Sequence, residues 1–204
     1  MLIDLAAIEA KHIHPILTQT VIPRPVAWVL SLNPGGDLNL APYSFFNAIS
    51  DHPKMVMFAS SGRKDTLRNV EETKVFTTSM VGRELASQVN LTSADSPYGE
   101  SEFGFSGLTV AEARLINAPF VAEAHAALEC KVTDIFQPRS IEGEPSGSFV
   151  VIGQVVGIHI DDAALVDGRL DMAAVAPLAR LGYMDYADGG NTFQMRRPPW
   201  PLKK

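Results

Sequence analysis

The feature that most constrains the fold is a succession of short apolar segments, each ended by turn-forming residues. Residues 26–31 are followed by the turn sequence 33–37, and residues 55–60 follow the turn sequence 51–53. Buried strands run for about four to eight residues, whereas helices need about ten or more. Fifteen glycines and fourteen prolines are scattered through the 204 residues and supply the turns. The pattern predicts a mostly β fold and argues against a helical bundle.

The spacing of apolar residues also predicts the remaining strands and helices. We expect strands at 26–31, 38–41, 55–60, 75–80, 128–134 and 149–160, and short helices at 65–72 and 82–91. The long segment 92–107 resembles a loop but contains Tyr98, Phe103 and Phe105, which is typical either of a binding lid or of aromatic side chains packed on the barrel. The sequence contains neither an internal repeat nor a clear linker. We therefore expect a single domain over 1–204, with an irregular tail from about 187 to 204.

The last long strand, 149–160, has an unusual composition. Its even positions, from Val150 to Ile160, form an apolar face interrupted only by Gln154. The opposite face carries Gly153, Gly157 and His159. Glycines at alternating strand positions allow either a tightly coiled sheet or the close approach of another group to the backbone.

Charge and cysteine content exclude several functions. A net charge of −6 gives no general attraction to nucleic acid, so we expect no nucleic-acid partner. The only cysteine, Cys130, cannot form an internal disulfide, and we expect an inert buried thiol. Redox chemistry would therefore need a bound cofactor. No stretch is apolar enough to span a membrane and the N-terminus is unlike a secretion signal, which predicts a cytoplasmic protein.

The densest polar cluster, residues 60–66, joins the end of a predicted strand to the start of a predicted helix. Serine, threonine, lysine and arginine side chains there would suit a phosphate, as would the free amides of the helix start. Asp65 complicates this interpretation, because an aspartate that caps the helix would occupy those amides and repel phosphate. The alternative is a capped helix whose charges are solvated.

A second cluster, residues 39–47, alternates small polar residues with aromatic rings around Pro42. Such a mixture suits a planar heteroaromatic ligand, although, taken alone, core packing of Phe45 and Phe46 explains it better. Arg24 lies between two prolines, which keep this segment stiff and extended. Its guanidinium could therefore be positioned to bind an anion, or it could form a surface ion pair.

Taken together and in this order, the motifs resemble those of the flavin reductase-like family. They are Pro23-Arg24-Pro25-Val26-Ala27-Trp28, Asn39-Leu40-Ala41-Pro42-Tyr43-Ser44-Phe45-Phe46-Asn47, Asp51-His52-Pro53 and Lys64-Asp65-Thr66-Leu67-Arg68-Asn69. The similarity extends over roughly residues 15–186. It implies a six-stranded antiparallel Greek-key split β-barrel with a few short peripheral helices, usually a homodimer, that holds FMN near the subunit interface.

The resemblance also implies which residues bind the cofactor. The flavin phosphate would contact Ser60, Ser61, Arg63, Lys64 and Thr66, with Arg24 as an additional anion contact. The ring system or the ribityl chain would contact Ser31, Tyr43, Ser44, Phe45 and Asn47. FAD in place of FMN is also compatible with the sequence.

The implied activity is that of an NAD(P)H-dependent flavin oxidoreductase. Flavin carries the hydride chemistry, and NADH or NADPH would stack on it directly because the sequence lacks a Gly-x-Gly-x-x-Gly turn. His159 is the candidate catalytic residue lining that cleft, or else an ordinary histidine at a strand end. The partner would be a nicotinamide nucleotide or another small-molecule substrate, with a monooxygenase or other electron acceptor downstream.

Two alternatives remain at this stage, and a metal site is not among them. The protein could be an electron-transfer flavoprotein without enzymatic activity, which passes electrons to a protein partner. The barrel could also hold haem or another planar ligand. His12 and His14 would share one face of an extended segment, but no third ligand lies nearby in the sequence, so we expect no metal site.

Overall fold

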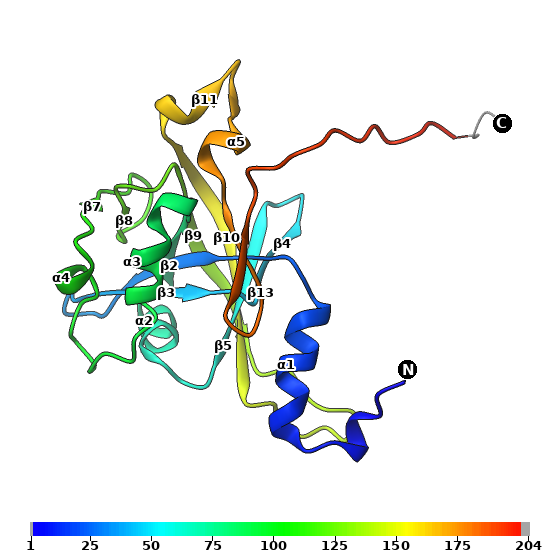
Figure 1. The fold of residues 1–204 in the computed structure, drawn as a ribbon. Coiled ribbons are helices and arrows are strands. Elements are labelled where there is room, and N and C mark those ends of the chain that lie inside the picture. The colour runs from blue at the N-terminus through cyan, green and yellow to red at the C-terminus, as the bar shows by residue number, and fades with distance from the viewer. Residues whose placement is uncertain (1, 201–204) are drawn as a thin grey trace.

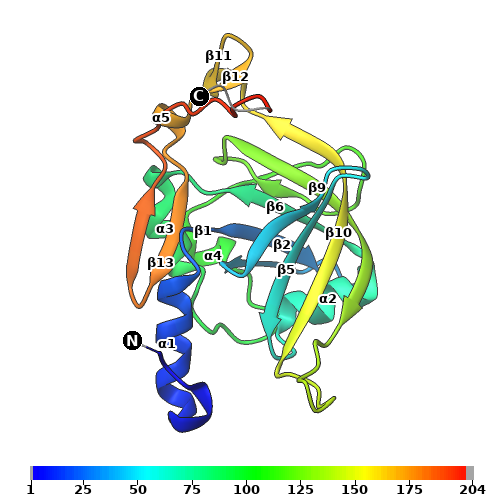
Figure 2. The same cartoon turned by 90° about the vertical axis from the view of Figure 1, so that its right-hand side faces the viewer.

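A computed structural model describes residues 2–200 and is dominated by one curled antiparallel sheet (Figure 1). Its seven strands, in sheet order, are β3 (Leu38–Tyr43), β2 (Ala27–Leu32), β6 (Val75–Met80), β9 (Ala126–Phe136), β10 (Ser148–Ile160), β5 (Met55–Ser61) and β4 (Phe46–Ser50). Figure 2 shows the sheet bending from β2 and β6 round to β5 and β10, so that it forms an incomplete barrel. The predicted mostly β fold is confirmed.

The predicted strand number was wrong by one, since the main sheet has seven strands instead of six. The difference arises at Ser44 and Phe45, where the backbone bends. The chain then resumes as β4, which pairs with β5 with Phe46 opposite Phe58. The alternation of residues 39–47 runs across this bend and does not reveal it.

Short elements surround the sheet. A second sheet has the order β1 (Arg24–Pro25), β13 (Leu178–Gly182), β14 (Asp185–Asp188), and two hairpins pair β7 (Val110–Ala111) with β8 (Phe120–Val121) and β11 (Leu165–Val166) with β12 (Arg169–Leu170). The helices are α1 (Ala10–Thr20), α2 (Asp65–Thr73), α3 (Ala86–Leu91), α4 (Phe103–Ser106) and α5 (Met172–Val175), and the 3-10 turns are η1 (Leu5–Ala7), η2 (Arg83–Leu85) and η3 (Asp162–Ala164).

Helix α1 has no counterpart in the sequence-based expectations, which treated its histidines as part of an extended segment. Residues two apart on an α-helix are separated by about 200° around its axis, so His12 and His14 point in different directions. The expected common face was therefore wrong. Within residues 2–200, no group of three or more histidine, cysteine, aspartate or glutamate side chains is arranged to hold a metal ion.

The core lies on both faces of β2. Trp28 and Leu30 are fully buried in a cluster with residues of α3 and the 108–124 segment. Val29 belongs to the opposite cluster, which contains Phe58 of β5 and Phe76 of β6. Successive strand residues point to opposite faces, so a strand covered on both sides is a continuous apolar run. This explains why residues 26–31 show no polar alternation.

Strand β10 buries the face opposite to the apolar even positions. Val151 and Gly153 are buried, whereas Ile158 and Ile160 are 63% and 44% exposed. A Cβ atom at Gly153 would lie 2.7 Å from the Phe76 ring, so this glycine is required by close packing inside the protein. Register shifts in the β9–β10 pairing explain why a simple alternation does not describe the strand.

The chain ends in an extended arm. Strand β14 continues to Asp188, slightly past the predicted start of the tail, and residues 189–200 form no helix or strand. Figure 1 shows this arm projecting away from the body of the protein. Residues 201–204 of the predicted tail lie outside the described residues. Between residues 2 and 200, no helix is both long and apolar enough to cross a membrane.

Candidate functional site

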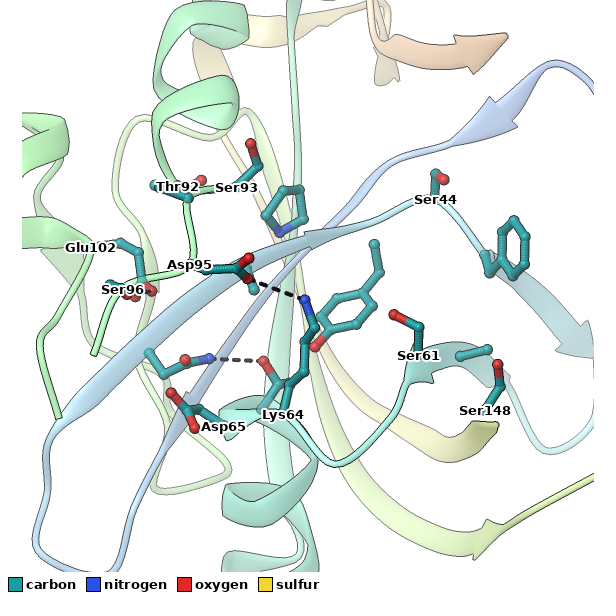
Figure 3. A pocket seen from close by; sticks show the side chains of 18 of the residues that line it. Ser44, Ser61, Lys64, Asp65, Thr92, Ser93, Asp95, Ser96, Glu102 and Ser148 are labelled. Atoms are coloured by element: carbon teal, nitrogen blue, oxygen red, sulfur yellow. Dashed lines mark hydrogen bonds and ion pairs between the residues drawn. The ribbon is translucent and has the colours of Figure 1, made fainter. Parts of the chain in front are cut away.

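A pocket of about 540 Å³ lies between strand β3, the bend that follows it, the start of α2 and the segment after α3 (Figure 3). Its walls combine aromatic and small residues with hydroxyl groups and charges. The lining residues are His14, Asn39, Ala41, Pro42, Tyr43, Ser44, Phe45, Ala59, Ser61, Lys64, Asp65, Thr66, Thr92, Ser93, Ala94, Asp95, Ser96, Glu102 and Ser148. Its volume falls within the range typical of small-molecule sites, about 300–1,000 Å³.

One end of the pocket is formed by the start of α2. Lys64 is the N-cap residue, and among the described residues no side chain caps the first turn of this helix. Asp65 is the first helical residue and pairs with Arg68 at 3.6 Å. It therefore does not occupy the first-turn amides in the way that a capping aspartate would. The positive end of the helix dipole and the Lys64 ammonium lie at the same place, which favours an anion.

Thr66 is held in place at this end by a buried polar network. Its Oγ1 accepts a hydrogen bond of 2.8 Å from Asn39 Nδ2, and its side chain is almost fully buried. Burial raises the pKa of Tyr43, and hydrogen bonds with Thr66 and Ser60 offset this only in part. Tyr43 is therefore a neutral phenol that can donate a hydrogen bond.

The opposite wall is the segment 92–102, and Glu102 attaches it to the sheet. The Glu102 carboxylate is 4% exposed and accepts hydrogen bonds from the Leu40 amide at 2.8 Å and from Ser96 Oγ at 3.0 Å. Because β3 is an edge strand, its outward amide needs such a partner. Asp95, from the same segment, reaches across the pocket to Lys64 Nζ at 3.3 Å (Figure 3).

The other end of the pocket presents an exposed aromatic ring. Phe45, at the bend after β3, remains 40% exposed. The His14 ring approaches it at a centroid distance of 6.3 Å, and the Arg24 guanidinium lies 5.8 Å from its centroid. The pocket thus offers a cation and hydroxyl donors at one end and ring surface at the other. This arrangement suits a planar molecule that carries an anionic tail.

The structure brings together six of the eleven predicted cofactor-binding residues. Tyr43, Ser44, Phe45, Ser61, Lys64 and Thr66 all line the pocket. They come from two segments that the sequence analysis treated as separate clusters, and the antiparallel sheet with α2 places the clusters side by side.

The other five predicted residues do not line the pocket, and each of them has a partner within the protein. Arg24 Nη1 donates to the carbonyl groups of Thr18 and Val21 at the end of α1, and Arg63 forms an ion pair with Glu71. Ser31 Oγ accepts hydrogen bonds from the side-chain amides of Asn39 and Asn69. Asn47 Oδ1 accepts a hydrogen bond from the Ala48 amide, and Ser60 Oγ donates one to the Gly62 carbonyl. Asn47 is exposed on β4. Ser31 and Ser60 still support the site indirectly, through Asn39 and Tyr43.

The structure does not bring His159, the candidate catalytic residue, to this pocket. His159 Nε2 lies 2.5 Å from the Glu129 carboxylate, and its ring stacks on Phe120 at 4.3 Å. Glu129 is fully buried and also accepts the amides of Arg114 and Leu115 at 2.9 and 2.7 Å. Burial alone would raise the pKa of Glu129, but these hydrogen bonds outweigh it and lower the pKa. The pair anchors the loop before β8 to the sheet.

Sequence reasoning missed the wall formed by residues 92–96 and Glu102. It identified the segment as a lid because of its aromatic residues, but the pocket is lined by the polar ones, and Tyr98 lies over Arg68 at 4.4 Å instead. The run Thr-Ser-Ala-Asp-Ser was the available signal. Cys130 is buried as predicted, and burial raises the pKa of its thiol to about 12.

Comparison with known proteins identifies relatives of similar length and fold. The sequence is 34% identical over 198 residues to an uncharacterized protein of Halalkalibacterium halodurans, covering 94% of each chain. The structure superposes on nitrilotriacetate monooxygenase component B from Bacillus cereus with a TM-score of 0.88 and 32% identity, covering 96% of this chain and 98% of the other. It also matches 2-nitrobenzoate 2-nitroreductase from Pseudomonas fluorescens, with a TM-score of 0.86 and 26% identity over 100% and 99% of the two chains.

A model of the flavin reductase like domain matches residues 19–178, which include the strands of the main sheet and nearly all of the residues that line the pocket. The match covers well over half of the chain. The chain therefore belongs to the flavin reductase-like family.

Proposed function

We propose that the protein is an FMN-binding oxidoreductase that accepts a hydride from NADH or NADPH. The observation that carries the proposal is the polarity of the pocket, with Lys64, Thr66 and the uncapped α2 turn at one end and Phe45 at the other. Family membership and the similarity to two redox enzymes support it.

The residues present fit FMN. The dianionic phosphate would be held by Lys64, Ser61 and Thr66, since charge-assisted hydrogen bonds to phosphate are the stronger ones. The ribityl chain would find hydroxyl partners in Ser44 and Ser93. The ring system would lie toward Phe45, whose exposed face offers a flat apolar contact. When bound, the flavin supplies the hydride-accepting chemistry.

The protein's own residues would bind the flavin and fix its orientation. Tyr43 remains protonated and its hydroxyl interacts with Thr66 and Ser60, while Glu102 holds the 92–96 wall on β3. The nicotinamide donor would enter from the end beside His14 and Phe45. We assign no catalytic acid, because hydride transfer to flavin needs none from the protein.

The proposal includes two partners. A homodimer is implied by the family resemblance, with the Phe45 end of the pocket near the second subunit. One structural relative is by name a component of a monooxygenase, which supports a downstream monooxygenase as the electron acceptor.

An absorption spectrum of the purified protein, followed by anaerobic addition of NADH or NADPH, tests this function. We expect a flavin band at about 450 nm that bleaches when one equivalent of either donor reduces the bound flavin. A stable band that neither donor bleaches would favour the electron-transfer flavoprotein, and a spectrum without flavin that FMN does not restore would contradict the proposal.

A further inference from the structure

A second hollow, separate from the proposed flavin pocket, lies where β6, β9 and β13 meet. It is a groove of about 330 Å³. Its walls are almost entirely apolar and include Val26, Met80, Val81, Ala126, Leu128 and Leu178. A cavity of about 150 Å³ is already large enough to bind benzene. The groove therefore has room for a large aromatic side chain, and its surface offers such a group few hydrogen-bonding partners.

The C-terminal arm, residues 189–200, carries apolar side chains that nothing in its own subunit covers to any large extent. Phe193, Met195 and Trp200 are 82%, 83% and 86% exposed. Phe193 and Met195 are two residues apart, so in an extended segment they project from the same side. Pro198 and Pro199 stiffen the arm and reduce the conformational entropy lost when it binds. Such an arm is typical of a segment that packs on another molecule.

The arm begins beside the groove but leaves it. The Gly189 amide donates to the carbonyl of Pro177, a groove residue, at 2.9 Å. From there the arm runs outward (Figure 1). At about 3.3 Å per residue, it spans about 35 Å, enough to cross to a neighbouring subunit.

The charges of the two surfaces are complementary. The arm contains Arg196 and Arg197 and no acidic residue. The groove ends at Ala126, and the adjacent His125 contacts the carboxylates of Asp161 at 3.2 Å and Glu84 at 3.5 Å. Both carboxylates are nearly half exposed. An arm lying along the groove would bring its arginines toward acidic partners.

We propose that the arm of one subunit lies in the apolar groove of a second copy of this chain, reciprocally in a twofold-symmetric dimer. Each large aromatic side chain buries about 150–250 Å². Two arms with two aromatic residues each supply about 600–1,000 Å². Specific interfaces bury about 1,200–2,000 Å², so the arms would add to a contact between the bodies of the two subunits. The inference rests on the homodimer within the proposed function but not on flavin binding.

Sedimentation velocity of full-length variants without added flavin tests the exchange. One variant changes the arm (F193S, M195S and W200S together), and another, Met80→Lys, places a charge in the groove that repels the arm's arginines. We expect the wild type to sediment at twice 22.1 kDa, and each variant to self-associate at least ten-fold more weakly. The matched control, Ile141→Lys, alters a fully exposed residue of the 137–147 loop and should remain dimeric.

Mixing the two variants separates exchange between subunits from folding back within one subunit. The arm variant has an intact groove and Met80→Lys has an intact arm, so the mixture should form a heterodimer that neither forms alone. Far-ultraviolet circular dichroism of both variants should match the wild type. A monomeric wild type, an arm variant that dimerises normally, or a mixture of folded variants without heterodimer would each overturn the proposal. None of these outcomes depends on whether the protein binds FMN.

Discussion

Two acid–base pairs in the structure differ in burial, and the difference shows how the fold separates support from binding. Glu129 is fully buried and contacts His159 at 2.5 Å while it accepts two backbone amides. The side chains of Lys64 and Asp95 are 57% and 93% exposed and lie 3.3 Å apart across the pocket. The first pair has all its partners within the protein, whereas the second can exchange one partner for a ligand.

The energetic consequences follow from solvation. Removing one member of a buried pair leaves a desolvated group without a partner, which is costly. An exposed pair contributes little to stability because water screens it. Substitutions in the Glu129–His159 pair should therefore lower the free energy of unfolding. Substitutions in the Lys64–Asp95 pair should instead change the affinity for a ligand.

The largest effect is expected for Glu129→Ala. It leaves His159 and the amides of Arg114 and Leu115 without their acceptor, and we expect the free energy of unfolding to fall by about 3–5 kcal/mol. Urea denaturation measures the change. Glu72→Ala, at an exposed position on α2, is the matched control and should change stability by less than about 0.5 kcal/mol. Equal effects of the two variants would remove the distinction between the pairs.

The same carboxylate makes stability depend on pH. Its pKa is lower in the folded protein than the unfolded value of about 4.3. Its contribution is therefore fully present above that value and is lost as the pH falls through the folded-state pKa. Glu129→Gln should show a smaller loss of stability between neutral and acidic pH than the wild type, and an unchanged pH profile would argue against this assignment.

An intermediate effect is expected for Lys64→Ala. It removes the ammonium from the phosphate end, and FMN affinity should fall by about 1–3 kcal/mol, or about 5- to 150-fold, while riboflavin affinity stays the same. Titration followed by flavin fluorescence measures both. Lys54→Ala is the matched control because Lys54 pairs with Asp51 outside the pocket. A loss of riboflavin affinity as large as that of FMN would instead indicate that Lys64 contacts the ring system.

The smallest effect is expected for Asp95→Asn. Removing this carboxylate releases Lys64 from its exposed partner and from competition with phosphate. FMN affinity should rise by about two- to five-fold at low salt, corresponding to about 0.4–1 kcal/mol for an exposed pair. The gain should shrink as ionic strength increases, because salt screens exposed charges. A fall in affinity at low salt would show that Asp95 supports the bound cofactor.

Some parts of the fold and of the pocket could be predicted from the sequence alone. Strands such as residues 55–60 were predictable because short apolar runs between turns leave few other structures. Lys64 and Thr66 were identified because hydroxyl and cationic side chains cluster next to a helix start. These signals are local, and a single sequence displays them directly.

Long-range contacts account for what was missed. Glu102 reaches the pocket by bonding Leu40, an edge-strand residue 62 positions away, and the identity of neither residue indicates the contact. Arg24 was placed at an anion site because helix α1, whose end it caps, was not expected. His159 was placed in the cleft because the register shifts in β10 change which side chains share a face.

The central claim is that the pocket recognises a planar ligand through a phosphate held beside Lys64. Isothermal titration of the wild-type protein with FMN and with riboflavin, at one ionic strength, tests it most directly because the two ligands differ only in the phosphate. We predict that FMN binds at least about ten-fold more tightly than riboflavin. Equal affinities for the two ligands would contradict the claim.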